Sequence, residues 1–412
     1  MHDQLFEQPA VVARYRGGPY AESREQFLRQ AQADGYSPAT LAQMAWALLI
    51  VAEAVHCEGG RITSKQLRSV LRKTRFKTTA RPPSANTIKL LLQPGERWLR
   101  SLGALIPEAE RPLKFATELR AFTEHMRVEQ GLSPTTIAGR DEQLRWFFAS
   151  LPFRVRSLPM VTIAHVDAFL EAYARRGWSR RSLCKLGSNL RSFFRYAAGQ
   201  GWCRSDLAQT IELPRLYALE DVPRAPSVEE IGRLLEDSAL SADPLDIRDH
   251  AVLSLLIHYG LRRSEVERLT LDDLDWVAET IRVTRLKLRR AQCYPLSVPV
   301  GEAILRYLRE ARPRCSHRAL FLTIQAPIRP LSGPSITFMV RKRLTKQGVR
   351  LNRRGAHCLR HACASQLLAA GFTLKQIADH LGHRSMDTTR IYTKIDLPAL
   401  RQVAEIDLGA LL

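Results

Sequence analysis

The sequence predicts a mainly α-helical protein with a small β-sheet in the last domain. Two observations favour helices in the first half of the chain. Apolar residues recur there with helical spacing, and Ser-Pro pairs stand where helices would begin. A third observation, a proline-rich stretch followed by short strand-like segments, indicates that the second half mixes helices with strands. With 412 residues the chain has room for about two to four domains.

Two helix starts in the first half resemble each other. Residues 35–41 read GYSPATL and residues 131–137 read GLSPTTI, with Ser placed to cap a helix and Pro in its first turn. Each start is followed by an apolar segment with helical periodicity. We therefore predict that residues 20–105 are a diverged copy of residues 114–205. The alternative is chance, because Ser-Pro helix starts are common.

These patterns divide the chain into four parts. Residues 1–110 are predicted to form an N-terminal helical domain, and residues 111–211 a second helical bundle. Residues 212–226 contain three prolines without apolar periodicity and are predicted to be a linker. Residues 227–412 form the last domain, which opens with the capping-box pattern Ser-Val-Glu-Glu. Within it we expect helices at 246–261, 301–312 and 357–370, and strands at 280–283, 292–298 and 320–322.

The charge balance predicts a polyanionic partner. Lys and Arg total 62 against 41 Asp and Glu, which gives a formal net charge of +21. Nucleic acid fits best, because neutralising phosphates releases counterions and drives binding. A generic basic surface is the plain alternative. A membrane partner is not expected, since no long apolar run or signal segment is found. The seven cysteines include no Cys-x-x-Cys pair, so we expect reduced thiols and a cytoplasmic protein.

The residues with the clearest chemistry lie near the end of the chain. His357 and Arg360 are three residues apart on a predicted helix, and His383 precedes Tyr392 by nine residues. Phosphoryl transfer needs neutralised phosphate oxygens, an in-line nucleophile and a proton for the leaving oxygen. Arg matches two phosphate oxygens, His moves protons near neutral pH, and a tyrosine beside cations becomes a useful nucleophile.

Cations also occur upstream in the last domain. Arg262 follows a predicted buried helix, and Lys287 stands in a basic turn between two predicted strands, where an ammonium could protonate a leaving oxygen. A further basic run is predicted to contact DNA phosphates, although a solvated helix face is the plainer interpretation. That run consists of Arg341, Lys342, Arg343 and Lys346.

Three ordered motifs now carry a resemblance to a known family. Residues 260–265 read GLRRSE, residues 357–361 read HCLRH, and residues 381–383 read LGH ahead of Tyr392. Together they resemble the arginine, second and third boxes of the tyrosine recombinases, or phage-integrase family. The resemblance covers residues of about 114–396. It implies a helical, SAM-like core-binding domain at 111–211 that binds DNA and an α+β catalytic domain with a C-terminal tail at 227–412.

The resemblance implies a role for each matching residue. Arg262 and Arg360 would bind the scissile phosphate, and Lys287 would be the general acid. His357 would assist proton transfer at Tyr392, and His383 would bind a phosphate oxygen. Glu265 would hold the site together from behind the arginines. Tyr392 would form a 3′-phosphotyrosyl bond, so that rejoining needs no cofactor. The sequence departs from the family at Arg263, where a smaller residue is usual, and in the lysine hairpin, which lacks glycines.

The expected function is site-specific DNA recombination, as integration, excision or transposition of a mobile element. Expected partners are double-stranded DNA, three further copies of the chain in a homotetramer that exchanges C-terminal tails, and accessory recombinases or DNA-bending proteins. We expect the protein in the bacterial cytoplasm, associated with the nucleoid. Two alternatives stay open: a type IB topoisomerase-like strand nicker and a DNA-binding regulator without catalysis. No metal is expected, because Arg360 lies between His357 and His361 and would repel a cation.

Overall fold

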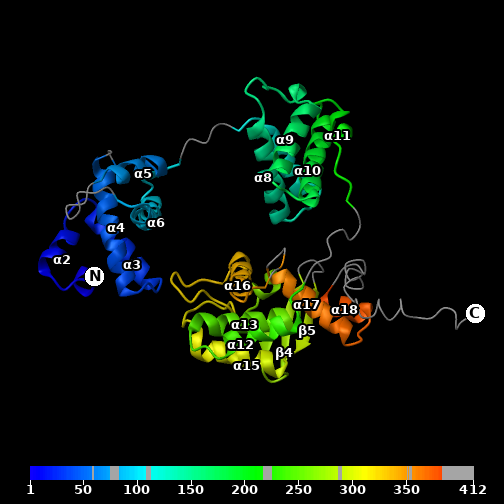
Figure 1. The fold of residues 1–412 in the computed structure, drawn as a ribbon. Coiled ribbons are helices and arrows are strands. Elements are labelled where there is room, and N and C mark those ends of the chain that lie inside the picture. The colour runs from blue at the N-terminus through cyan, green and yellow to red at the C-terminus, as the bar shows by residue number, and fades with distance from the viewer. Residues whose placement is uncertain are drawn as a thin grey trace, which may run out of the picture. The chain divides into compact units, whose positions relative to one another are not determined.

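The computed structural model describes residues 1–57, 60–74, 83–107, 113–216, 225–285, 290–349, 351 and 355–382 (Figure 1). The chain divides into two compact units. One is Ile106–Glu220, and the other groups Met1–Leu105 with Asp221–Leu412. Each of the three segments has its own hydrophobic core. The predicted domain boundaries remain predictions.

The N-terminal segment is a helical bundle around α4. Helix α4 is apolar and long enough over Pro38–His56 to cross a membrane, but 61% of that stretch is buried by neighbouring helices, as in the core helix of a globular bundle. A capping box at Thr63 begins the amphipathic helix α5. The elements are α1 (His2–Leu5), α2 (Pro9–Arg16), α3 (Ala21–Ala33), α4 (Pro38–Cys57), β1 (Ile62–Thr63), α5 (Ser64–Lys73), α6 (Ala85–Ser101) and β2 (Leu105–Ile106).

The second unit is a helical bundle with an aromatic core. Phe122, Phe147, Phe148 and Phe193 are fully buried, and their rings meet edge to face or tilted, the arrangements that aromatic pairs prefer. Ser133 and Ser179 cap α8 and α10 through side-chain hydrogen bonds. The elements are α7 (Ala116–Val128), α8 (Pro134–Ser150), η1 (Leu158–Met160), α9 (Ile163–Arg175), α10 (Arg180–Gly199) and α11 (Leu207–Thr210).

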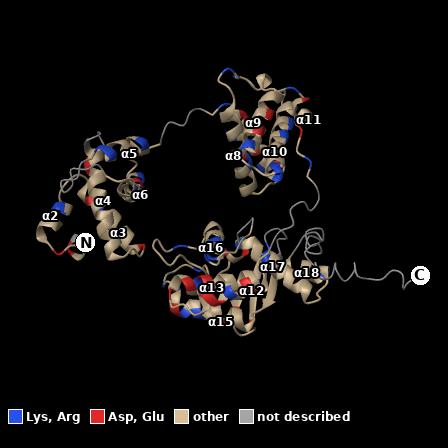
Figure 2. Cartoon of the chain, in the orientation of Figure 1, with Lys and Arg blue, Asp and Glu red and all other residues tan. Residues whose placement is uncertain are grey.

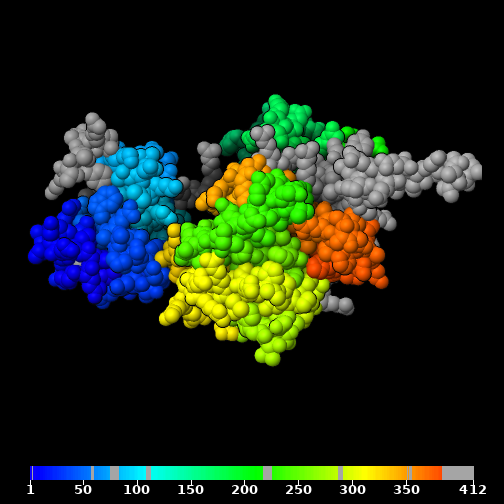
Figure 3. All heavy atoms as spheres, turned by 60° about the horizontal axis from the view of Figure 1, so that its bottom comes forward, coloured from blue at the N-terminus to red at the C-terminus, as the bar shows by residue number. Residues whose placement is uncertain are grey.

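The last segment packs helices and a three-stranded antiparallel sheet, in the order β3-β4-β5, around the buried helix α13. Segments far apart in the sequence meet here, as the adjoining green, yellow and orange surfaces of Figure 3 show. The elements are α12 (Val228–Ala239), α13 (Pro244–His258), α14 (Arg263–Val266), η2 (Leu271–Asp273), β3 (Leu274–Asp275), β4 (Thr280–Arg285), β5 (Arg290–Pro295), α15 (Val298–Arg306), η3 (Tyr307–Ala311), α16 (Gly333–Lys346), α17 (Ala356–Ala369) and α18 (Leu374–Leu381).

The structure confirms the predicted fold class, mainly α with a small sheet, and corrects some details. The predicted third strand at 320–322 is wrong, because Leu322 forms only an isolated bridge to Pro330. Leu274–Asp275 takes the place beside β4. The helix predicted at 301–312 begins three residues earlier, at Val298, and ends in the π-helical turn η3. Within the predicted linker, residues 217–224 lie outside the described residues.

Candidate active site

Three backbone turns from distant parts of the sequence meet in the last segment, and arginines join them. The first turn is at Gly260 and follows α13. The second is at the start of α17, and the third is at Leu381–Gly382, where α18 ends. Each coincides with one of the three sequence motifs. Folding therefore gathers the described parts of the motifs into one site.

Arg360 joins two of these turns. It lies on α17, and its side chain is among the largest fully buried side chains, at 1% relative exposure. Its Nη1 donates to the carbonyl of Gly260 at 2.6 Å, and its Nη2 donates to the carbonyl of Leu381 at 2.6 Å. The guanidinium plane is therefore fixed by backbone on both sides. A fixed plane suits a group that must meet two oxygens of an anion at once.

Arg262 is held by Glu265. The Arg262 side chain stays 25% exposed, while its Nη1 donates to Glu265 Oε1 at 2.8 Å and its Nη2 donates to the carbonyl of Gly382 at 3.1 Å. The backbone N–H of Arg262 also donates to Glu265 Oε2, at 2.7 Å. Glu265 thus fixes both the main chain and the side chain of Arg262. The supporting role in catalysis that the resemblance implies for Glu265 remains a prediction.

Arg285 is a site residue that the sequence reasoning missed. It ends β4, is 1% exposed, and its Nη1 donates to Glu265 Oε2 at 2.5 Å. Its Nη2 donates to the hydroxyl of Tyr294 and to the carbonyl of His380 at 3.0 Å. Arg285 therefore ties Glu265 to the end of α18. The available signal was strand alternation, because Ile281 and Val283 are buried on the same face of β4.

The Glu265 carboxyl is ionised in this setting. Burial alone would raise its pKa, but the charge of Arg285 and hydrogen bonds from Arg285 and Arg262 outweigh that effect and hold the pKa below its ordinary value. One carboxylate thus serves two guanidiniums. Arg262, Arg285 and Glu265 together retain a net positive charge, which favours an anion beside them.

Two glycines allow the turns to approach closely. Gly260 has φ +57°, and a Cβ there would lie 2.6 Å from Leu381 Cδ2. Gly382 has φ +62°, and a Cβ there would lie 2.9 Å from Arg285 Nε. Both positions require a left-handed backbone and leave no room for a side chain. The glycines of the first and third motifs are therefore needed to bring Arg262, Arg285 and Arg360 together.

An open cleft of about 670 Å³ adjoins Arg262. Arg262, Arg263, Arg341 and His357 all line it, and none of the described residues around it is acidic. His357 is exposed and packs edge to face on His361, with ring centroids 4.4 Å apart. Such a cleft, lined by guanidiniums and an imidazole, fits an anionic group and can exchange protons with it.

His361 does not share the exposure of His357. Burial, together with the nearby charges of His357 and Arg360, lowers the pKa of His361 to about 4. It is therefore neutral at physiological pH and supports the packing beneath His357. Lys287, His383 and Tyr392 lie outside the described residues, so their predicted roles remain predictions.

The basic run on α16 separates into different environments. Arg341 and Lys342 are exposed, and Arg341 lines the cleft. Lys346 is exposed but donates to Asp237 at 2.9 Å. Arg343, in contrast, is buried at 8% exposure, and it alone among the four faces the interior.

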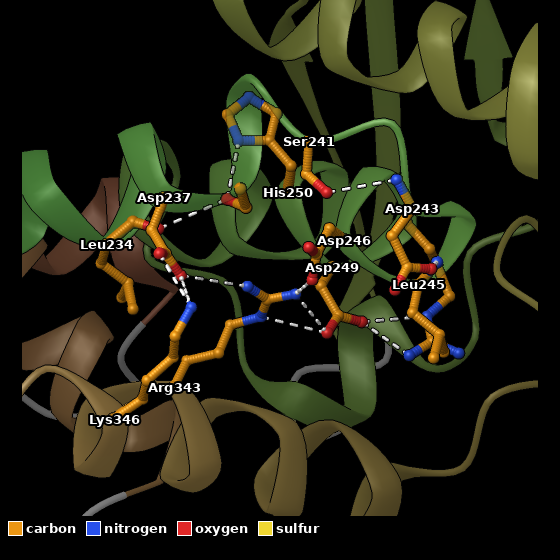
Figure 4. Close-up of polar contacts among 12 residues, drawn as sticks. Leu234, Asp237, Ser241, Asp243, Leu245, Asp246, Asp249, His250, Arg343 and Lys346 are labelled. Carbon is orange, nitrogen blue, oxygen red and sulfur yellow. Dashed lines mark hydrogen bonds and ion pairs between the residues drawn. The ribbon is translucent and has the colours of Figure 1, made fainter.

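Figure 4 shows the ion pairs of Arg343 with neighbouring carboxylates. Its guanidinium is surrounded by carboxylates, with Nη2 2.9 Å from Asp249 and 2.5 Å from Asp246, and Nη1 3.8 Å from Asp237. Burial would lower the pKa of Arg343, but these carboxylates raise it, so the charge is retained. Its donors are therefore occupied inside the fold. The expectation that Arg343 contacts DNA is corrected: it joins α16 to α12 and α13.

Comparison with known proteins agrees with this site. Residues 227–397 match the model of the phage integrase family, and residues 119–201 match the phage integrase N-terminal SAM-like domain. The integrase/recombinase y4rA of Sinorhizobium fredii is 39% identical over 316 residues, which are 74% of this chain and 75% of that protein. The tyrosine recombinase XerC of Azotobacter vinelandii is 31% identical over 69% of this chain and 94% of its own.

Solved structures share the fold. The XerH site-specific recombinase, in a post-cleavage complex with its palindromic difH substrate, superposes with a TM-score of 0.56 at 21% identity, over 70% of this chain and 84% of that chain. Lambda integrase residues 75–356, bound to a core site, superposes with a TM-score of 0.54 at 16% identity, over 67% of this chain and 94% of that chain. The motifs, the assembled arginines, the family models and the relatives coincide, and the chain belongs to the phage integrase family as a site-specific tyrosine recombinase.

Proposed function

We propose that the protein cuts and rejoins double-stranded DNA at specific sites through a covalent 3′-phosphotyrosyl intermediate on Tyr392. The observation that carries the proposal is the convergence of Arg262 and Arg360 on the carbonyls of Leu381 and Gly382, directly before His383 in the sequence. The adjoining cleft, which has no acidic side chain among its described lining residues, suits the sugar-phosphate backbone of a duplex.

In this mechanism the Tyr392 hydroxyl attacks the scissile phosphorus, and the bond to the 5′ oxygen breaks. Arg262 and Arg360 neutralise the charge that develops on the non-bridging oxygens, and His383 adds a hydrogen bond. His357 takes the tyrosine proton, and Lys287 donates a proton to the departing 5′ oxygen. Attack by a 5′ hydroxyl on the phosphotyrosine reverses every step. The energy of the broken bond is kept in the ester, so the rejoining needs neither ATP nor a cofactor.

The biological role that we favour is movement of a mobile element in a bacterium, at the nucleoid. The relatives support this, because y4rA is named an integrase/recombinase. Recombination joins two duplexes, so four copies of the chain would assemble, with accessory recombinases or DNA-bending proteins where the site requires them. The apolar C-terminal residues Leu400, Val403, Ile406 and Leu408 would dock on a neighbouring copy and couple the sites.

Deleting residues 399–412 is expected to abolish synapsis while leaving cleavage of a single duplex measurable, because the active site lies elsewhere. Native gel shifts and a two-plasmid recombination assay measure the two steps. Unchanged recombination would remove the tail from the proposal. A monomer that relaxes supercoils without exchanging strands would instead identify a topoisomerase-like nicker.

A nicked suicide duplex from the DNA that flanks the native gene tests the covalent step. The wild-type chain is expected to form an adduct that survives a denaturing gel, because the nick releases the short strand bearing the 5′ hydroxyl. Tyr392→Phe is expected to form none, since no other phenol would be in line. Tyr173→Phe, a change in the second unit, is the control. An adduct that persists in Tyr392→Phe, or maps to another peptide, would contradict the assignment.

A further inference from the structure

The two N-terminal bundles share unusual backbone features. Tyr20 precedes α3 with φ +55°, and Phe115 precedes α7 with φ +59°. Only three non-glycine residues in the described part of the chain have a positive φ, and these are two of them. In each bundle the first long helix is followed by a left-handed glycine, Gly35 or Gly131. A bulky residue in this conformation is rare, so the coincidence is informative.

The caps of the following helices repeat as well. The backbone N–H of Thr63 donates to Gln66 Oε1 at 3.0 Å, and that of Thr162 donates to His165 Nδ1 at 3.1 Å. The serine caps of the later helices also correspond. Ser84 and Ser179 each accept from the backbone N–H three residues on, at 3.2 and 3.3 Å. These matched caps align α5 with α9 and α6 with α10.

The helices α5 and α9, which follow the capping threonines, carry opposite charges at corresponding positions. Five and nine residues after the capping threonine, α5 has Arg68 and Arg72, whereas α9 has Asp167 and Glu171. All four side chains are exposed. The exchange therefore leaves the cores alone and changes only what each helix presents to its surroundings.

The helices α6 and α10, which follow the capping serines, show the opposite difference: here the second bundle carries the cations. One, two and six residues after its capping serine, α10 has Arg180, Arg181 and Lys185. At the same positions α6 has Ala85, Asn86 and Leu90. The three cations at the start of α10 thus have no counterpart in α6, and a different basic surface stands on α5. If the first bundle binds DNA, it does so with a different face.

The charged residues of α5 are all cations. Lys65, Arg68, Arg72 and Lys73 are exposed, α5 contains no Asp or Glu, and Figure 2 shows blue segments along it. Within the described part of the chain, none of the four forms an ion pair or a side-chain hydrogen bond. Elsewhere in this bundle exposed arginines do pair, as Arg29 does with Glu25 at 2.8 Å. The charges on α5 are therefore left for a partner outside the bundle.

A groove runs beside this helix. It has a volume of about 840 Å³ and is lined by Arg68, Arg72 and Lys89 as well as apolar side chains of α6. Glu96 also lines it, and its carboxylate lies 3.4 Å from Arg100. Lys65 and Arg72 are seven residues apart, which is about 10 Å along a helix. A DNA strand carries one phosphate for about every 3.4 Å of duplex, so the stripe can face several phosphates.

From these observations we infer that the N-terminal bundle is a diverged copy of the second bundle, and that its α5–α6 face binds the phosphate backbone of duplex DNA beyond the cleavage core. The inference rests on the proposed function, since it adds a second DNA-binding surface for the same substrate. A rival occupant is the acidic face of α9 in another copy of the chain. Duplex DNA is favoured, because Glu171 is already paired with Arg175 at 3.0 Å and the whole chain carries +21.

The double variant Arg68→Asp with Arg72→Glu tests the inference in the full chain. It places on α5 the residues that α9 carries at the same positions, so the fold is expected to tolerate it. Fluorescence anisotropy with a long duplex containing the core site, at several salt concentrations, gives the affinity and its salt dependence. Each lost phosphate contact lowers the slope of log affinity against log salt by about 0.9, so a drop of about 2 is expected, with at least tenfold weaker binding.

Arg14→Asp with Arg29→Glu is the matched control, because it removes the same charge from exposed positions of the same bundle. The control is expected to keep most of the slope, and both variants should keep the wild-type melting temperature. Equal slopes in the test variant and wild type would overturn the inference. Unchanged DNA binding with loss of self-association, measured by light scattering, would also overturn it and identify α9 of a second copy as the partner.

Adduct formation on a short duplex limited to the core separates this inference from the proposed function. Arg68→Asp with Arg72→Glu should form the adduct on the short duplex as the wild type does, because α5 does not touch the scissile phosphate. A wild-type chain without an adduct would refute the proposed function, whatever the anisotropy shows. A normal adduct, together with an unchanged salt slope in the double variant, would refute only the DNA-binding surface on α5 and α6.

Discussion

Replacing Arg262 or Arg360 with alanine is expected to slow strand cleavage by about 10²–10³-fold, the loss typical when one preorganised donor is removed from a transition state. Each guanidinium is fixed by a backbone carbonyl of the turn at Leu381–Gly382. Both guanidiniums are therefore held in place before a phosphate arrives. Single-turnover cleavage of the suicide duplex, with saturating protein, measures the chemical step apart from binding.

The substitution by lysine distinguishes charge from geometry. Arg262→Lys keeps a cation but not the planar fork, so it should recover only part of the rate. Arg318→Ala removes an exposed arginine that pairs with Asp272, and it is expected to cleave normally. Near-normal cleavage by either alanine variant would contradict the roles proposed for Arg262 and Arg360.

Replacing Arg285 with methionine is expected to destabilise the protein by about 3–5 kcal/mol, because it leaves the Glu265 carboxylate buried without its main partner. Arg285 is 1% exposed and Glu265 is 3% exposed, so water cannot take the place of the lost donor. Cleavage should slow too, since Glu265 orients Arg262. Urea unfolding monitored by circular dichroism, alongside single-turnover cleavage, measures both effects.

The double variant Arg285→Met with Glu265→Gln separates stability from positioning. Neither partner of the buried Arg285–Glu265 pair is then charged, so most of the stability should return, while cleavage stays slow because a neutral amide holds Arg262 less firmly. The pH dependence gives a second check. The lowered pKa of Glu265 stabilises the wild type above the ordinary carboxyl value of about 4.3, and this stabilisation is lost as the pH falls through the folded-state pKa. The stability difference between wild type and Arg285→Met should therefore narrow in acid. A constant difference would show that Arg285 acts through packing alone.

The fold could be predicted where local signals are strong. The capping boxes at Ser227 and Thr373 mark true helix starts, because their side chains satisfy backbone donors in the first turn. The third strand could not be placed, since a strand as short as Leu274–Asp275 exists only through pairing with β4. Residues 320–322 have the composition of a strand, but their backbone pairing stops at isolated bridges and forms no continuous ladder.

The candidate site was predictable from its motifs but not from its buried charges. Arg262 and Arg360 come together as expected, whereas Arg285 belongs to no motif and emerges only from its packing. The basic run on α16 shows the converse. Consecutive residues of a helix point to different sides, so Arg343 faces the carboxylates of α13 while Arg341 faces the cleft. Composition alone cannot separate those two environments.

The order in which the chain is synthesised bears on the shared turn at Leu381–Gly382. Arg262 and Arg360 leave the ribosome before the carbonyls of Leu381 and Gly382 that orient them, so neither guanidinium can be held in place until α18 has been made. A product of premature termination would keep the basic helices but lack the end of α18. Such a fragment would leave the guanidiniums of Arg262 and Arg360 without the carbonyls that orient them.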